Sequence, residues 1–327
     1  MTTFMDTHRA QAAEPGPAEL VLMASLAREF FLEGKSKVEL ATEYGLSRYK
    51  IARLLNAARD IGLVEVKIRL PERLDADLSH QLRARFNLRR AIVVDTPQSS
   101  QVSLREAFAP VVADLLTELI EPDDVVGIPW SRVLTLAARL VKSLAQCTIV
   151  QASGAVVHSD VDETAVELVR RLAGVSGSRF INYYGPIVAP TAETARSMRA
   201  SAAAAAVAAM ASLTKVFVSV GSWESGLSTV YDSIDPKEAA VLHELGAVGE
   251  CAGLLFDRDG APITALDDRV IGMSFDQLKR TPERVVIVYG AEKLEAARAV
   301  VRGGLATIMV TDDALGRLLL AEAAHCR

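Results

Sequence analysis

Basic and hydroxyl side chains gather in one short stretch near the start of the chain. Between Tyr44 and Arg59 there are four basic residues and no acidic one. Arginine suits a bidentate contact to guanine, and neighbouring basic groups can contact phosphate. The residues expected to face a DNA duplex are Ser36, Ser47, Arg48, Tyr49, Lys50 and Arg53. The same pattern also fits a solvated charged face of a structural helical domain, or a head that binds another protein.

A second set of candidates follows the apolar runs farther along the chain. Free N–H groups at a helix start favour a bound anion, and a lysine placed there works against the helix dipole unless an anion accompanies it. Together with the residues that stand at the ends of the other apolar runs, the candidates are Gly127, Ser131, Arg132, Gln151, Ser153, Gly154, Gly221, Trp223, Gly290 and Lys293. Trp223 suits either stacking on a sugar or covering the core. Ordinary strand-to-helix turns remain the alternative for the whole set.

Catalytic and metal-binding patterns are not found in the sequence. His158 and His243 lie in different segments, and no GxSxG, HExxH or GxxxxGKS motif occurs. Cys147, Cys251 and Cys326 are too far apart in the sequence to indicate a zinc site or a disulfide framework. We therefore assign no catalytic residue, no metal ligand and no cofactor.

The composition fits a two-domain protein of the cytoplasm. The chain has 327 residues, half of them hydrophobic, and a net charge of −5. Its N-terminus lacks the continuous apolar region of a secretory signal. The alanine tract at 200–212 is shorter than the roughly 20 residues of a membrane span, and it predicts a buried helix. We expect no contact with a membrane.

The elements that would position the basic residues form a small helical head. Residues 1–18 read as a flexible lead-in, and 19–70 as a helix-turn-helix domain. Ala41, Gly45, Ile51 and Leu54 have the spacing that packs two short helices around a tight turn. The run "LVEVKIRL" alternates as a strand would, and could begin a wing. Residues 71–90 carry leucines at four-residue spacing, which predicts a helical connector that packs on its own subunit or on another copy.

From residue 91 to 327 apolar runs alternate with helical patterns. This alternation predicts a mostly parallel, Rossmann-like sheet covered on both faces. The stretch "VGECAGLLFDRDGAPIT" breaks the rhythm and predicts a small antiparallel excursion. In such sheets ligands bind at the carboxyl ends of strands, so the candidates of the second set should meet at one edge. The fold class expected is α/β with an added helical head.

The head together with the C-terminal motifs resembles the SorC-type, DeoR-like sugar-binding bacterial transcriptional regulators. The residues that carry the resemblance are "GKSKVELATEYGLSRYKIARLLNAARDIGLVEVKI", "VGECAGLLFDRDG" and "DDRVIGMSFDQLKRTPERVVIVYGAEKLEAARAVVRGGLATIMVTDDALGRLLL". The resemblance implies a winged helix-turn-helix head and an effector-binding and oligomerisation domain with the fold of sugar-phosphate isomerases, without their catalysis. It also implies tetramers and a phosphorylated sugar or polyol as effector.

The resemblance also implies roles for single residues. Family effector residues map onto "GIPWSRVL", "VQASG", "FDRDG" and "GAEK", which adds Trp130 and Asp257 to the candidates. By that mapping Asp257 would accept hydrogen bonds from sugar hydroxyls, and Lys293 would meet the phosphate. Two departures stand out: Ser131 and Val133 replace the family's usual Gly and Thr, and Tyr289 replaces the first glycine of a pair. Both lie where the phosphate or sugar would bind, which leaves the phosphorylation of the effector open.

The function expected is therefore a DNA-binding transcriptional regulator, taken as a repressor, whose operator affinity is controlled by a carbohydrate. Its partners would be a double-stranded DNA operator, a small carbohydrate or phosphorylated carbohydrate, and further copies of itself. The alternative is a sugar-phosphate isomerase or deaminase with an added head, for which the sequence offers no evident general base.

Overall fold

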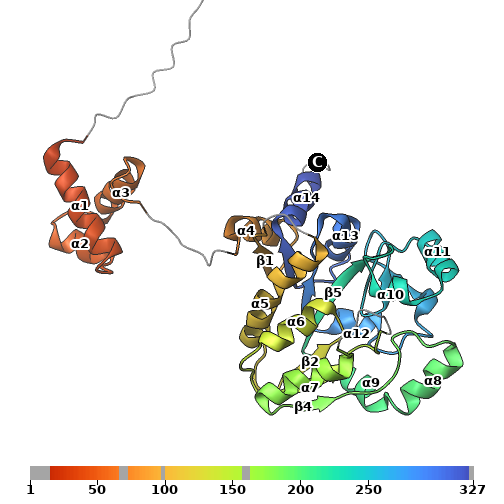
Figure 1. Ribbon diagram of the computed structural model, residues 1–327. Helices are drawn as coiled ribbons and strands as arrows, with labels where there is room; N and C mark the ends of the chain where they lie inside the picture. The colour runs from red at the N-terminus through yellow and green to blue at the C-terminus, as the bar shows by residue number, and fades with distance from the viewer. Residues whose placement is uncertain (1–14, 66–72, 97–99, 157–162, 324–327) are drawn as a thin grey trace, which may run out of the picture. The chain divides into compact units, whose positions relative to one another are not determined.

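The computed structural model describes residues 15–65, 73–96, 100–156 and 163–323, and it divides the chain into two compact units, 1–69 and 70–327 (Figure 1). The expected lead-in therefore falls almost wholly outside the described residues, as does most of the expected wing strand. Within the described ranges, no helix is both long enough and apolar enough to cross a membrane.

The first unit is a three-helix head with its own core. Its helices are α1 (Pro17–Phe31), α2 (Lys37–Glu43) and α3 (Arg48–Asp60). Proline at the first helical position starts α1 two residues before the expected boundary. Gly45 takes a φ of 62° in the turn between α2 and α3, a conformation that costs glycine little. The buried residues that lock the three helices together are Met23, Leu26, Ala27, Leu40, Ile51, Leu54, Leu55 and Ala58.

The second unit is built on a parallel sheet, as the alternating pattern predicts. Its strands run in the order β1-β10-β9-β5-β2-β3-β4. They are β1 (Arg90–Val94), β2 (Val125–Ile128), β3 (Thr148–Gln151), β4 (Arg179–Ile181), β5 (Lys215–Ser222), β9 (Glu283–Ile287) and β10 (Ile308–Asp312). Every neighbouring pair on this path is parallel.

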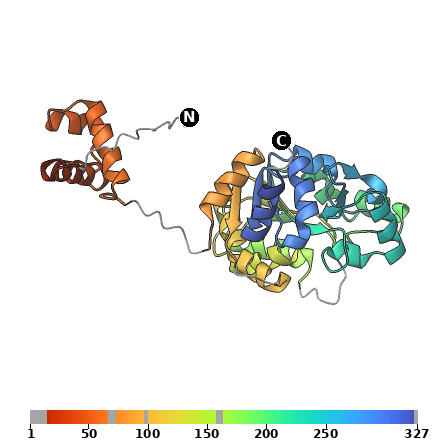
Figure 2. The same ribbon diagram turned by 90° about the horizontal axis from the view of Figure 1, so that it is seen from above.

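Two layers of helices bury the two faces of this sheet (Figures 1 and 2). One face packs against α5 (Gln101–Leu119), α6 (Arg132–Leu140) and α7 (Ala165–Ser176). The other packs against α4 (Ala76–Arg85), α9 (Ala204–Met210), α13 (Leu294–Arg302) and α14 (Asp313–Ala323). The remaining helices are α8 (Ala192–Ala200), α10 (Thr229–Ser233), α11 (Pro236–Glu244) and α12 (Phe275–Arg280), with short 3-10 turns η1 (Thr264–Leu266) and η2 (Ala291–Lys293).

The predicted antiparallel excursion is confirmed. Strand β6 (Gly249–Cys251) pairs antiparallel with β5, and β7 (Leu254–Phe256) and β8 (Pro262–Ile263) continue the ribbon. The turn between β6 and β7 has two residues, Ala252 at φ 54° and Gly253 at φ 86°. Two successive positive φ angles match the twist of a tight hairpin.

Two expected elements differ from the structure. The connector helix spans only Ala76–Arg85, capped by Asp75, because the chain must already be extended at Arg90 to pair with β10. Its Leu78 and Leu82 are buried against α14 of the same unit. The alanine tract splits into the end of α8 and α9, and only one side of α9 is buried, at Ala206 and Met210.

Candidate functional site

The outward face of α3 presents its polar side chains to solvent. Arg48, Tyr49, Lys50 and Arg53 are all exposed, Tyr49 by 89%. Ser47 lies just before the helix, and its Oγ accepts the Lys50 N–H at 3.2 Å. An exposed N-terminal turn with basic side chains is the arrangement that a recognition helix offers to the major groove.

Ser36 has a capping role in the structure. Its Oγ accepts the Glu39 N–H at 3.2 Å, and the Glu39 carboxylate accepts the Ser36 N–H at 2.7 Å, so the two residues form a capping box. This hydroxyl is therefore already hydrogen-bonded within α2, and a contact with DNA would have to share it.

A buried carboxylate links α2 to α1 behind the exposed face. Glu29 accepts hydrogen bonds from the Tyr44 hydroxyl at 2.6 Å and from Lys35 Nζ at 2.9 Å. The bonds from Tyr44 and then Lys35 lower the pKa of Glu29. Arg59 lies 5.0 Å from the centre of the Phe31 ring, which engages it with α1. These contacts hold α1 against α2, and α3 against α1.

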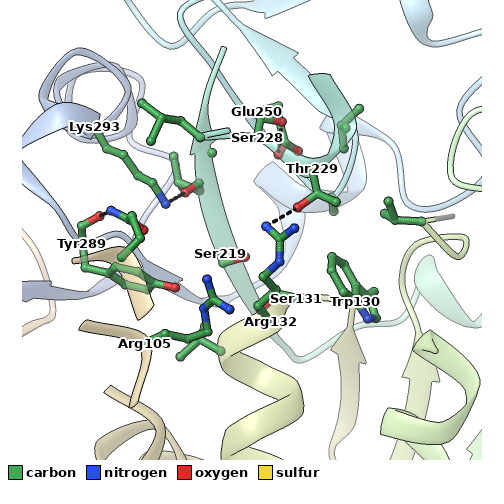
Figure 3. A pocket seen from close by; sticks show the side chains of 18 of the residues that line it. Arg105, Trp130, Ser131, Arg132, Ser219, Ser228, Thr229, Glu250, Tyr289 and Lys293 are labelled. Carbon is green, nitrogen blue, oxygen red and sulfur yellow. Dashed lines mark hydrogen bonds between the residues drawn. The ribbon is translucent and has the colours of Figure 1, made fainter. Parts of the chain in front are cut away.

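A pocket lies in the second unit beside the carboxyl ends of β2, β5 and β9 (Figure 3). Parallel strands meet there at one edge, where α/β sheets commonly bind ligands. The lining residues are Gln101, Arg105, Trp130, Ser131, Arg132, Val133, Val156, Ile187, Ser219, Val220, Gly221, Gly226, Leu227, Ser228, Thr229, Val230, Glu250, Ala252, Tyr289 and Lys293.

Three cations line this pocket. Figure 3 shows Arg105, Arg132 and Lys293 converging beside β5. Arg132 Nη1 donates to Thr229 Oγ1 at 3.0 Å, and Lys293 Nζ donates to the Val220 carbonyl at 3.2 Å. The pKa of Lys293 is lowered to about 8, chiefly by burial; the positive charges of Arg105 and Arg132 act in the same direction, while Glu292 and Glu250 oppose the shift.

Glu250 is the carboxylate among the lining residues. It is buried on β6 and accepts hydrogen bonds from Ser228 Oγ at 3.0 Å and from the Gly253 N–H at 3.1 Å. Burial raises its pKa, and the two hydrogen bonds partly offset the rise. Gly221 is directly opposite in the sheet register, and a β-carbon there would lie 2.7 Å from Glu250 Oε1. The glycine therefore leaves the space that Glu250 occupies.

Five residues chosen from the sequence line the pocket: Trp130, Ser131, Arg132, Gly221 and Lys293. Trp130 donates through its indole N–H to the Glu163 carbonyl at 2.8 Å, which fixes its ring at the pocket wall. Ser131 Oγ accepts the Leu134 N–H at 3.1 Å and so caps α6. Ser131 therefore stands at a helix start, and its hydroxyl is already hydrogen-bonded there.

The candidates near β2 and β3 are not among the lining residues. Gly127 packs inside the sheet, with Leu213 2.9 Å from where its β-carbon would be. Gln151 is fully buried, donates to the Ser153 carbonyl and accepts the Tyr183 N–H. Ser153 Oγ accepts the Trp130 N–H at 3.1 Å.

Four further candidates also take structural roles away from the lining. Gly154 lies against the backbone of Pro186, where no β-carbon would fit. Trp223 is 1% exposed and donates to the Ala239 carbonyl, so it covers the core and does not stack on a ligand here. Asp257 accepts the N–H groups of Asp259 and Ala261, which closes its hairpin turn. Gly290 takes a φ of 93° and donates to Asp312.

Other lining residues were missed by the sequence reasoning. Glu250 is a single acidic residue inside the apolar run "VGECAGLL", and an isolated charge in a buried strand is a signal that could have identified it. Ser228 caps α10 and Thr229 is its first residue, and only the tertiary structure brings this short helix beside the pocket. Arg105 lies on the second turn of α5, where a charged residue on a helix is ordinary. Among the described residues, no three of His, Cys, Asp and Glu gather where they could hold a metal ion.

Comparison with known proteins gives a consistent result. The family model described as "Putative sugar-binding domain" matches residues 72–321. The transcriptional regulator YjhU of Escherichia coli (strain K12) is 28% identical over 303 residues, which is 89% of this chain and 92% of that protein. The deoxyribonucleoside regulator of Bacillus subtilis (strain 168) is 23% identical over 307 residues, 92% of this chain and 97% of the other.

A solved structure has the same fold along almost the entire chain. The full-length sorbitol operon regulator SorC from Klebsiella pneumoniae superposes with a TM-score of 0.69 at 20% identity, covering 93% of this chain and 99% of that one. A domain of a possible sugar-binding transcriptional regulator from Arthrobacter aurescens TC1 covers 77% of this chain with a TM-score of 0.67 at 22% identity.

Proposed function

Since the chain belongs to the sugar-binding-domain family, we propose that it is a DNA-binding transcriptional regulator, acting as a repressor, whose operator affinity is controlled by a sugar, sugar phosphate or polyol. The observation that carries this proposal is the exposed basic face of α3 in a chain whose other unit holds a polar pocket. The relatives named above are called a transcriptional regulator, a deoxyribonucleoside regulator and a sorbitol operon regulator, and these names support the same conclusion.

The two units divide the work in this proposal. Residues 19–70 bind the operator through Arg48, Tyr49, Lys50 and Arg53, with Ser36 and Ser47 at the helix starts. The connector and residues 91–327 bind the effector and other subunits. Because the protein would act on chromosomal DNA of a bacterium, the cytoplasm is its expected location.

The mechanism follows from the geometry of duplex recognition. A dimeric or tetrameric regulator places two heads on half-sites about one helical turn apart. A ligand that binds one arrangement of subunits better than another shifts the population towards it and changes the spacing of the heads. We propose a tetramer of this kind.

Selection of binding sites from a random-sequence DNA pool tests the DNA-binding function. The wild-type protein should enrich one sequence family, and the double variant Arg48→Ala/Lys50→Ala should enrich none at the same salt. The matched control, Lys237→Ala/Arg280→Ala, removes two exposed cations outside the head and should select the wild-type sequence. Equal enrichment by the Arg48/Lys50 variant would remove α3 from the interface.

A thermal-shift screen of free and phosphorylated sugars and polyols tests the effector function. A ligand that binds only the folded state raises the melting temperature. The compounds that raise it should change the affinity for the selected operator, whereas a compound that stabilises the protein without changing DNA affinity would not be an effector.

The enzyme alternative gains one observation from the structure. Glu250 and Lys293 both line the pocket, so acid and base groups are present. Glu250, however, already accepts hydrogen bonds from Ser228 and Gly253. We expect the purified protein to return every sugar phosphate of the panel unchanged, which an NMR spectrum of each incubated compound will check.

A further inference from the structure

Some polar groups of the pocket have hydrogen-bond partners within the protein, and others do not. We propose that Arg105, on α5, is the specificity-determining residue that binds an oxyanion of the effector, while the part of the pocket beside Glu250 takes uncharged hydroxyl groups. This inference rests on the proposed effector site and assigns a role to a residue outside all the sequence motifs.

Arg105 has an unsatisfied donor. Its Nε is buried and has no hydrogen-bond partner among the described residues. Its guanidinium lies near the Tyr289 hydroxyl and opposes the rise that burial gives the pKa of Tyr289. Leaving a buried donor of a charged group unpaired is costly, so such a group calls for a partner that the protein chain does not supply. A ligand oxygen in the pocket would supply it.

The other two cations are already hydrogen-bonded to the protein. Arg132 donates to Thr229, and Lys293 donates to the Val220 carbonyl. Arg132 is thereby bound to the first residue of α10, whose N-cap Ser228 donates to Glu250. Both cations contribute positive potential, but Arg105 is the one with a buried donor left to offer.

Glu250 determines which part of the ligand faces which end of the pocket. The oxygens of a carboxyl group accept hydrogen bonds from hydroxyl groups, and the group offers an anion no positive charge. An anion is therefore favoured beside Arg105 and disfavoured beside Glu250. Figure 3 shows the two side chains apart, with Ser219 of β5 between their ends in this view.

The chemistry at Arg105 selects an oxyanion with two oxygens that can bind in parallel. Nε–H and one terminal N–H of a guanidinium form a fork that matches a carboxylate or a phosphate. A phosphate ester and a sugar acid share this chemistry. Inorganic phosphate and acetate serve as separate probes for the two sources.

The test is a thermal-shift titration of the full chain with sodium phosphate and with sodium acetate, each against sodium chloride at equal ionic strength. At least one of the two anions should raise the melting temperature of the wild type beyond chloride. Arg105→Gln should weaken that anion's apparent affinity roughly tenfold or more, because a hydrogen bond to a charged group is lost. Arg105→Lys keeps the positive charge but loses the two parallel N–H donors, so its apparent affinity for the anion should lie between those of the wild type and Arg105→Gln. The matched control Arg280→Gln removes an exposed guanidinium and should titrate as the wild type does.

A direct readout covers the case in which Arg105→Gln folds poorly. In a spectrum of arginine side-chain ¹⁵Nε–H groups, the Arg105 signal is identified by its absence from Arg105→Lys. It should shift on addition of the stabilising anion and not on addition of chloride. No stabilisation by either anion, an unchanged titration in Arg105→Gln or an unmoved Arg105 signal would each overturn the proposal.

Failure of the proposed function would look different. If the anion binds through Arg105 but no sugar compound alters operator affinity, the oxyanion site stands and the regulatory role fails. If a compound alters operator affinity equally in the wild type and in Arg105→Gln, the regulatory role stands and the assignment of Arg105 fails.

Discussion

The pKa of Lys293 differs between the folded and the unfolded chain. Burial at the pocket wall lowers its pKa to about 8. A lysine in an unfolded chain has a pKa of about 10.4. Between these two values the unfolded chain holds a proton that the folded protein has released, so this residue's contribution to stability rises with pH there.

This sign gives a measurable pH dependence. In urea unfolding, the free energy of unfolding of the wild type should increase relative to Lys293→Met between about pH 8 and pH 10, by at most about 1.4 kcal/mol per pH unit. Below about pH 7 the difference between the two proteins should be constant. Parallel curves across the entire range would mean that Lys293 keeps its ordinary pKa.

Tyr49 separates recognition from stability. Its side chain is 89% exposed, so Tyr49→Ala should change the free energy of unfolding by no more than about 0.5 kcal/mol. If the ring contacts a base edge, specific operator affinity should fall by roughly 1–3 kcal/mol while binding to unrelated DNA is unchanged. Fluorescence anisotropy with both DNAs at one salt concentration measures this. An equal loss on both DNAs would indicate a backbone contact.

At the scale of elements, the sequence predicts the alternation of strands and helices along the chain from residue 91 onward. The apolar runs within β5 (Lys215–Ser222) and β9 (Glu283–Ile287) form central strands because most of their residues are buried between the two helical layers. The connector was placed too long because its leucine spacing continues to Phe86, while pairing of Arg90 with Ile308 ends the helical region. The spacing of neighbouring residues gives no information about pairing with a strand that lies far along the chain.

The pocket was predicted in part because strand ends are visible in a sequence and side-chain directions are not. Ser131 and Lys293 follow strands and line the pocket, whereas Gln151 is the last residue of β3 and accepts the Tyr183 N–H. Glu250 and Arg105 come from a short hairpin strand and a helix that only the tertiary structure brings to the same place. Their roles depend on register and packing more than on any motif.

The hairpin that carries Glu250 makes a prediction at this scale. Ala252 holds a positive φ, a conformation that costs a residue with a β-carbon roughly 1–2 kcal/mol. Ala252→Gly should therefore raise the free energy of unfolding by up to about 1 kcal/mol, after the larger backbone entropy of glycine in the unfolded chain is subtracted. Chemical denaturation measures it, and a clear loss of stability would show that the alanine methyl packs favourably in the turn.

At the scale of the entire molecule, the proposed assembly brings the heads of two subunits onto one DNA duplex. Two linked heads bind their half-sites with an avidity that exceeds either alone by roughly 10²–10⁴. A fragment of residues 1–69 should therefore bind the selected operator at least about a hundredfold more weakly than the full chain. Analytical ultracentrifugation should find the fragment monomeric and the full chain tetrameric. Equal affinities would contradict the proposed assembly.

The boundary between the units has an evolutionary consequence. The contacts divide the chain between Arg69 and Leu70, and the family model begins at residue 72. Because the effector-binding unit begins where the DNA-binding head ends, it can be joined to the head of another regulator without disturbing its own core. A chimera carrying the head of a relative should respond to the same metabolite but at the relative's promoter. Effector specificity and operator specificity can therefore evolve independently.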